Sequence, residues 1–133
     1  MPRKPRLPTE GQLAILAVLW DIDAPSTVRE VHEALPARTR RGYTTTLKLM
    51  QLMVEQGLLE RDEHGRAHTY RPRRAERQTQ RALVDDLVDR AFRGSASKLV
   101  MRALERGRTS DEELDEIRRL LDQVERERGE DPS

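Results

Sequence analysis

The sequence predicts a mostly α-helical protein that contains one small β-hairpin. Two observations support this fold class: apolar residues recur at helical spacing over most of the chain, and a single short segment around Gly65 has the composition of a hairpin. The predicted order of helix, helix, helix and hairpin is that of a winged helix-turn-helix. We therefore divide the chain into a winged-helix domain at 1–73, a helical dimerisation region at 74–128 and a frayed tail at 129–133.

Threonine residues mark the starts of the first two predicted helices. Thr9 is followed three residues later by Gln12, which has the form of a capping box, and this helix ends near 21–24. Residues 25–27 form a turn or a very short strand, and Thr27 can cap a second helix at 28–35. Pro36 ends that helix because proline cannot continue it.

A basic loop at 38–42 leads into a third helix, which runs to Gln56 and is closed by Gly57 as a C-cap. Two short segments, 58–62 and 67–71, then form the predicted hairpin, and Pro72 ends it. Helices are predicted for the remainder, at about 74–93, 96–106 and 111–127. The last of them starts behind a capping box that begins at Ser110.

The composition limits the classes of protein. Of the 133 residues, 35% are hydrophobic and 37% are charged, which is little apolar material for a monomer and favours a core shared in an oligomer. The absence of cysteine excludes disulfides, zinc-thiolate sites and a thiol nucleophile. No apolar run approaches the roughly 18 residues of a membrane span, and the N-terminus lacks a signal peptide, so we expect a cytoplasmic protein without membrane insertion.

The charge is unevenly distributed along the chain. Residues 1–75 carry 13 Lys/Arg and 9 Asp/Glu, a net charge of +4, whereas 76–133 carry 12 and 15, a net charge of −3. A basic half suits a polyanion, and an acidic helical half suits a protein partner.

The third predicted helix has two different faces. At about 100° per residue, its inner face gathers Thr46, Leu47, Met50, Met53 and Val54, and its outer face gathers Thr44, Thr45, Lys48, Gln51, Leu52 and Glu55. The first two turns of the outer face therefore offer hydroxyls and an ammonium, and the acid lies at the far end. A recognition helix meets base edges with its N-terminal residues, so we assign base reading to Thr44, Thr45 and Lys48.

Five further side chains are assigned to DNA phosphates: Arg40, Arg41, Tyr43, Arg66 and His68. In the alternative interpretation, Thr44 only caps the helix, Thr46 is buried and Lys48 is solvated. For Thr46 we favour burial, and for Thr45 and Lys48 we favour contact with DNA. The outward position of Leu52 suggests an apolar contact beyond the reading tip.

Neither a metal site nor catalysis is expected. His64 and His68 flank a turn with only Asp62 or Glu63 as nearby further ligands, and solvated hairpin residues are the better interpretation. The chain has no phosphate-binding glycine loop, nucleophile elbow or HExxH motif. We predict a protein that is not an enzyme and has no cofactor.

The last predicted helix carries a narrow apolar seam. Leu114, Ile117, Leu121 and Val124 recur at steps of three, four and three, which is coiled-coil spacing. We expect this seam to pack against a second copy of the chain. The alternative is that the C-terminal helices fold back on their own winged domain.

Six segments in order carry a resemblance to a known family. They are "AVLW", "PSTVREVHEAL", "YTTTLKLMQLMVEQGLL", "GRAHTYRP", "GSASKLVMRAL" and "SDEELDEIRRLLD". Over nearly the whole chain, they resemble the penicillinase-repressor (BlaI/MecI) family. The resemblance implies a homodimeric winged-helix repressor of inverted-repeat operators, which often control a β-lactamase or a membrane metallopeptidase sensor. It also implies a membrane metallopeptidase sensor pathway as a partner. Related copper-responsive repressors bind metal through C-terminal cysteines, which this chain lacks.

One position departs from the family pattern. Penicillin-responsive members are cleaved at an Asn-Phe pair, and Arg102-Ala103 stands there in this chain.

Two other function classes stay open: a winged helix that binds protein without operator recognition, and a ligand-sensing regulator. Tyr43, Tyr70 and Phe92, the only aromatic residues after position 40, offer little to line a ligand pocket.

Overall fold

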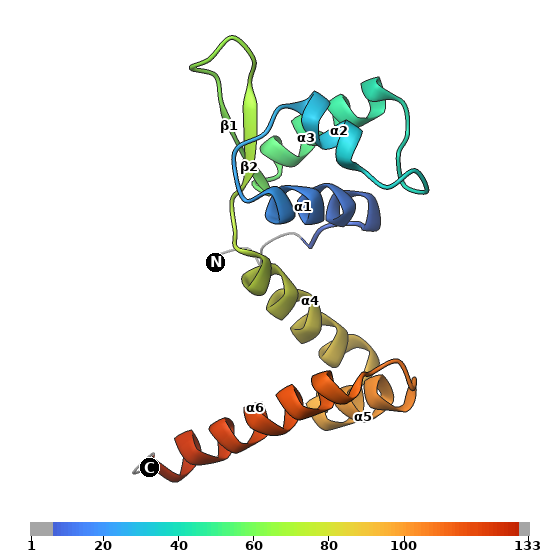
Figure 1. The fold of residues 1–133 in the computed structure, drawn as a ribbon, viewed down its shortest axis with the longest axis vertical. Helices are drawn as coiled ribbons and strands as arrows, with labels where there is room; N and C mark the ends of the chain where they lie inside the picture. Colours follow the sequence, from blue (N-terminus) through green and yellow to red (C-terminus); the bar gives the residue numbers. More distant parts are fainter. Residues whose placement is uncertain (1–6, 131–133) are drawn as a thin grey trace. The chain divides into compact units, whose positions relative to one another are not determined.

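The computed structural model describes residues 7–130 and shows a mostly helical chain with one antiparallel hairpin, which confirms the predicted fold class (Figure 1). The elements follow in the order α1 (Glu10–Ile22), α2 (Val28–Ala34), α3 (Tyr43–Glu55), β1 (Leu59–Asp62), β2 (Thr69–Pro72), α4 (Glu76–Ala91), α5 (Ala96–Glu105) and α6 (Asp111–Glu130). The chain forms two compact units that divide between Asp86 and Leu87, within α4. The domain limits at 73 and 128 remain predictions.

The helix starts predicted from threonine are confirmed. At α1, the side chain of Thr9 accepts from the backbone N–H of Gln12, and the Gln12 side chain accepts from the backbone of Thr9. At α2, Thr27 and Glu30 make the same reciprocal pair. Each box satisfies N–H groups that the first turn of a helix cannot bond internally.

The end of α3 is a Schellman motif built on Gly57. Gly57 has φ 79°, and its N–H donates to the carbonyl of Val54 at 3.1 Å. The next N–H, that of Leu58, donates to the carbonyl of Met53 at 2.9 Å, and the Leu58 side chain is buried. Glycine suits this position because its left-handed backbone is costly for other residues. The chain is thereby turned from α3 into β1.

The hairpin is slightly shifted from its predicted position. Leu59 pairs with Pro72 and Asp62 pairs with Thr69, so Pro72 is the last residue of β2 rather than the first residue after it. Proline is tolerated at a strand end on an edge because no ladder donor is needed there. Ser26 forms an isolated bridge with Tyr70, in which each residue's N–H donates to the other's carbonyl at 3.0 and 2.8 Å. Of the turn and the very short strand considered for 25–27, the structure shows a single bridge residue, Ser26, beside the hairpin.

One apolar core lies between α1, α2, α3 and the base of the hairpin. Its buried members are Ile15, Leu16, Val18, Leu19, Val28, Val31, Leu35, Met50, Met53, Leu58, Leu59 and Tyr70. Met50, Met53 and Val31 have no exposed surface, so α3 is held against the rest of the unit by side chains on its inner face.

The second unit comprises the end of α4 with α5 and α6. Helix α5 has no buried residues, and α6 continues to Glu130, beyond its predicted end at 127. The rest of the predicted tail, 131–133, lies outside the described residues, as do the basic residues 1–6. No helix in the described part of the chain is long and apolar enough to cross a membrane.

Candidate nucleic-acid interface

The outer face of α3 is exposed as its sequence pattern predicts. Exposed side chains belong to Thr44, Thr45, Lys48, Gln51, Leu52 and Glu55, whereas Thr46, Met50 and Met53 are buried. The burial of Thr46 agrees with the interpretation that we favoured for this residue. The first turns of α3 therefore present hydroxyls and one cation to solvent, and they contain no acidic residue.

The start of α3 differs from one alternative that the sequence left open. Its N-cap is Gly42, which makes no side-chain capping bond, so Thr44 does not cap the helix. Tyr43, Thr44 and Thr45 lie within the first turn instead. The positive end of the helix dipole and its unbonded N–H groups are consequently left uncovered by a side-chain cap, beside the two exposed threonines.

Thr46 is tied to α2 through a polar contact. Its hydroxyl lies 2.9 Å from Nδ1 of His32, and the His32 ring meets the Tyr43 ring edge-on, with centroids 5.6 Å apart. The guanidinium carbon of Arg29 lies 5.4 Å from the centroid of the Tyr43 ring. Sequence analysis missed Arg29 and His32, because no local motif links residues of α2 to residues of α3.

Arg40 and Arg41 differ in their surroundings. One terminal nitrogen of Arg40 donates to the carbonyls of Glu33 and Leu35, at 3.0 and 2.7 Å, and so satisfies the C-terminal end of α2. Arg41 is exposed and lines a groove of about 380 Å³ together with Thr45 and Arg38. Arg40 is thus held by the protein itself, whereas Arg41 lines a groove beside the tip of α3.

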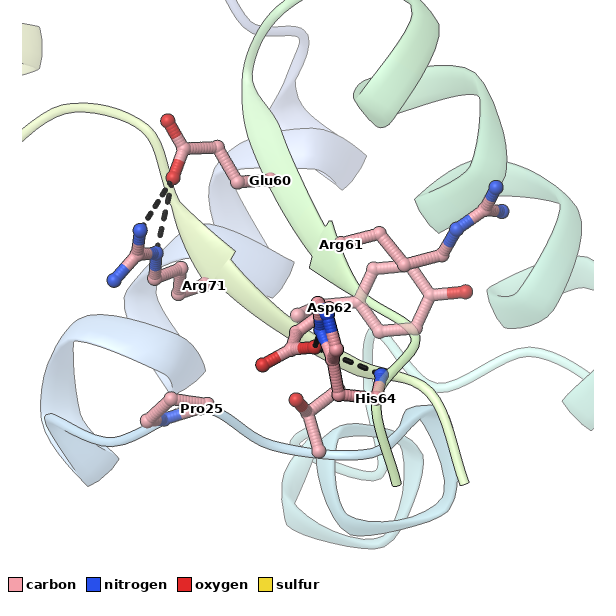
Figure 2. Close-up of a pocket in the computed structure, with 8 residues that line it drawn as sticks. Pro25, Glu60, Arg61, Asp62, His64 and Arg71 are labelled. Atoms are coloured by element: carbon pink, nitrogen blue, oxygen red, sulfur yellow. Dashed lines mark hydrogen bonds and ion pairs between the residues drawn. The ribbon is translucent and has the colours of Figure 1, made fainter. Parts of the chain in front are cut away.

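The hairpin carries surface ion pairs, and Figure 2 shows the one between Arg71 and Glu60. Arg71 bonds Glu60 at 2.9 Å across the two strands, and Arg61 bonds Glu63 at 2.7 Å. Arg66 and His68 are exposed in the connecting loop. Exposed pairs of this kind contribute little stability, so their main effect is to neutralise charge on the strands. Arg66 is left as an exposed cation at the tip.

A tight turn fixes the start of the hairpin loop. The backbone N–H of His64 donates to Oδ1 of Asp62 at 2.9 Å, and the same oxygen lies 2.6 Å from Nδ1 of His64 (Figure 2). The backbone hydrogen bond is the largest cause that lowers the pKa of Asp62 below its usual 3.8, and the side-chain contact adds to it. His64 therefore serves the turn, and His68 does not join it.

Within residues 7–130, no group of three or more His, Asp or Glu side chains is placed to hold a metal ion. The expectation that the protein needs no metal or cofactor stays a prediction.

The apolar seam of α6 is covered at one end only. Leu114 and Ile117 are half-buried, whereas Leu121 and Val124 are 56% and 38% exposed. Leu120, beside the seam, is 58% exposed. The C-terminal half of the seam therefore has little cover within a single chain.

Comparison with known proteins gives consistent matches over nearly the whole chain. The family model described as "Penicillinase repressor" matches residues 8–123. The proteins named "Transcriptional regulator BlaI" from two strains of Mycobacterium tuberculosis, CDC 1551 and H37Rv, are 33% identical over 120 residues, which cover 90% of this chain and 86% of theirs. The "Penicillinase repressor" of Bacillus licheniformis is 23% identical over 115 residues, 86% of this chain and 89% of its own.

Proposed function

The chain belongs to the penicillinase repressor family, and from this membership we propose that it is a transcriptional repressor that binds an inverted-repeat DNA operator as a homodimer. One observation carries the proposal: the exposed tip of α3 offers two hydroxyls and an ammonium without a carboxylate. A carboxylate at this position would face the phosphates, whereas hydroxyls and an ammonium can bond base edges. The same membership supports a regulatory protein rather than an enzyme.

Base reading is assigned to Thr44, Thr45 and Lys48. Each threonine can bond a base edge through its hydroxyl or pack its methyl group on thymine, and Lys48 suits the acceptors of guanine. Their roles depend on exposure at the start of α3, which all three have. The burial of Thr46 removes it from this set.

Phosphate contacts are assigned to Arg40, Arg41, Tyr43, Arg66 and His68. Arg41, Arg66 and His68 are exposed and free to adapt to a backbone. Arg40 already bonds two carbonyls through one nitrogen, so it would reach a phosphate with its remaining donors. Such contacts position the protein and add salt-dependent affinity that does not depend on base sequence.

Dimerisation is assigned to Leu114, Ile117, Leu121 and Val124. A two-fold dimer would present two recognition helices to one side of the duplex, so half-site centres should lie about 34 Å apart or a multiple of it.

The pair Arg102-Ala103 replaces the Asn-Phe pair of penicillin-responsive members, and Arg102 is engaged in an ion pair with Glu105 at 3.2 Å. The proposal therefore covers operator binding and does not include cleavage at this pair through a metallopeptidase sensor.

The test begins with selection of bound duplexes from a random library, followed by affinity measurements at several salt concentrations. Lys48→Ala should weaken the selected site more than random DNA, by about 1–3 kcal/mol, because it removes a base contact. Arg66→Ala should weaken both duplexes alike and reduce the salt dependence. If a variant with alanine at Arg40, Arg41 and Lys48 binds as well as wild type, DNA binding through this surface is wrong. A wild type without salt-dependent duplex binding would favour a protein-interaction module.

A further inference from the structure

Four side chains form a continuous cluster where α2 meets the start of α3. Thr46 contacts His32, His32 contacts Tyr43, and Tyr43 contacts Arg29, at the distances given above. Burial falls along this series: Thr46 is 3% exposed, His32 is half-buried, Tyr43 is 40% exposed, and Arg29 is exposed. The cluster thus begins in the core and ends with a guanidinium at the surface.

The position of Arg29 is set by its neighbours. It is the second residue of α2, and its guanidinium contacts the ring of the first residue of α3. A guanidinium is attracted to an aromatic face, and this contact limits the number of conformations that a long side chain adopts. Tyr43 is in turn fixed by His32, which is held by the buried hydroxyl of Thr46.

The guanidinium of Arg29 has unused hydrogen-bonding capacity with respect to residues 7–130. In the described part of the chain, its guanidinium forms no ion pair with a carboxylate. Its neighbour Glu30 is occupied in the capping box of α2. Contact with a ring uses one face of the guanidinium, whereas the five N–H donors lie in its plane and remain directed at the surroundings.

We propose that Arg29 is a DNA-phosphate contact that is held in place by the ring of Tyr43. The inference rests on the proposed operator binding and adds a second role for Tyr43: besides the phosphate contact assigned to it above, its ring holds Arg29 in place. In a helix-turn-helix the helix before the recognition helix crosses the DNA backbone, which brings α2 to phosphates. A guanidinium with its donors free matches the two oxygens of a phosphate.

Four variants test the proposal on the full chain: Arg29→Ala, Tyr43→Phe, Tyr43→Leu and Arg29→Ala combined with Tyr43→Leu. Arg29→Ala should weaken selected and random duplexes alike, roughly tenfold for each chain that binds, because it removes a charge-assisted phosphate contact from each chain. The slope of log K against log salt, which is negative, should become less steep by about 0.9 for each chain that binds. Ethylation interference should lose the same phosphates in Arg29→Ala and in Tyr43→Leu.

The Tyr43 variants separate the ring from the hydroxyl. Tyr43→Phe should lose less affinity than Tyr43→Leu, because it keeps the ring that holds Arg29. The losses caused by Arg29→Ala and Tyr43→Leu should not add in the double variant, because both changes remove the same Arg29 contact. Arg119→Ala, which removes an exposed cation from α6, is the charge-matched control and should leave the salt slope unchanged. Thermal melting checks that each variant is folded.

Two outcomes would overturn the proposal: an unchanged salt slope in folded Arg29→Ala, or equal losses in Tyr43→Phe and Tyr43→Leu. Either result leaves operator binding by wild type intact, so the proposed function would survive it. Loss of the proposed function would show differently, as wild type that binds no duplex in a salt-dependent manner.

Discussion

Substitution of Leu121 gives the sharpest test of the dimer. Full burial of a leucine side chain contributes roughly 1.5–3 kcal/mol, and Leu121 is 56% exposed in one chain. Covering that remainder should contribute about 1 kcal/mol per chain and about 2 kcal/mol per two-fold dimer. Leu121→Ala removes most of this contribution, so the dimer Kd should rise by roughly 30-fold.

The double change Ile117→Asp with Leu121→Asp should have a larger effect, because a dimer would have to bury carboxylates without partners. We expect a monomer that has lost most of its operator affinity while its winged domain stays folded. Arg119→Ala is the matched control. Arg119 is two positions from both Ile117 and Leu121, so its side chain lies about 200° around the helix from each of theirs. This substitution should leave the dimer intact.

Sedimentation velocity over a range of micromolar concentrations measures the association, and melting curves report on the winged domain. Operator binding is measured on the same preparations. If wild type sediments as a monomer at these concentrations and binds a single asymmetric half-site, the prediction of a dimer and the prediction of a palindromic operator are both wrong.

Three further outcomes are expected. Met53→Ala should destabilise the winged domain by about 2–5 kcal/mol, as chemical denaturation would show, because Met53 has no exposed surface in the core. The folded-state pKa of the Asp62 carboxyl is lowered, so NMR should show this group titrating below 3.8. The stability that its turn contributes should be complete above about pH 4 and should be lost as pH falls through the lowered pKa. A titration midpoint that is not shifted would contradict the hydrogen bond from His64. Chelator treatment should change neither DNA affinity nor melting temperature, and a large loss of either would contradict our interpretation of His64 and His68.

The sequence by itself determined the elements whose signals are local. Thr9 and Thr27 act on N–H groups within the next three residues, and Gly57 is required by the backbone conformation of its own position. The two faces of α3 follow from helical spacing alone. For this reason the helix starts, the Schellman turn and the exposed threonine tip could be predicted without knowledge of the fold.

Only the tertiary structure decided which side chains support that tip. The contact between His32 and Thr46 spans 14 positions, and it exists because α2 packs against α3. The charge and position of Arg40 predict a phosphate contact, and the fold also brings this side chain onto the last carbonyls of α2. Tyr43 and Arg29 likewise meet only after the two helices have packed. Local patterns report interactions within a helical turn, whereas these contacts depend on the packing of one element against another.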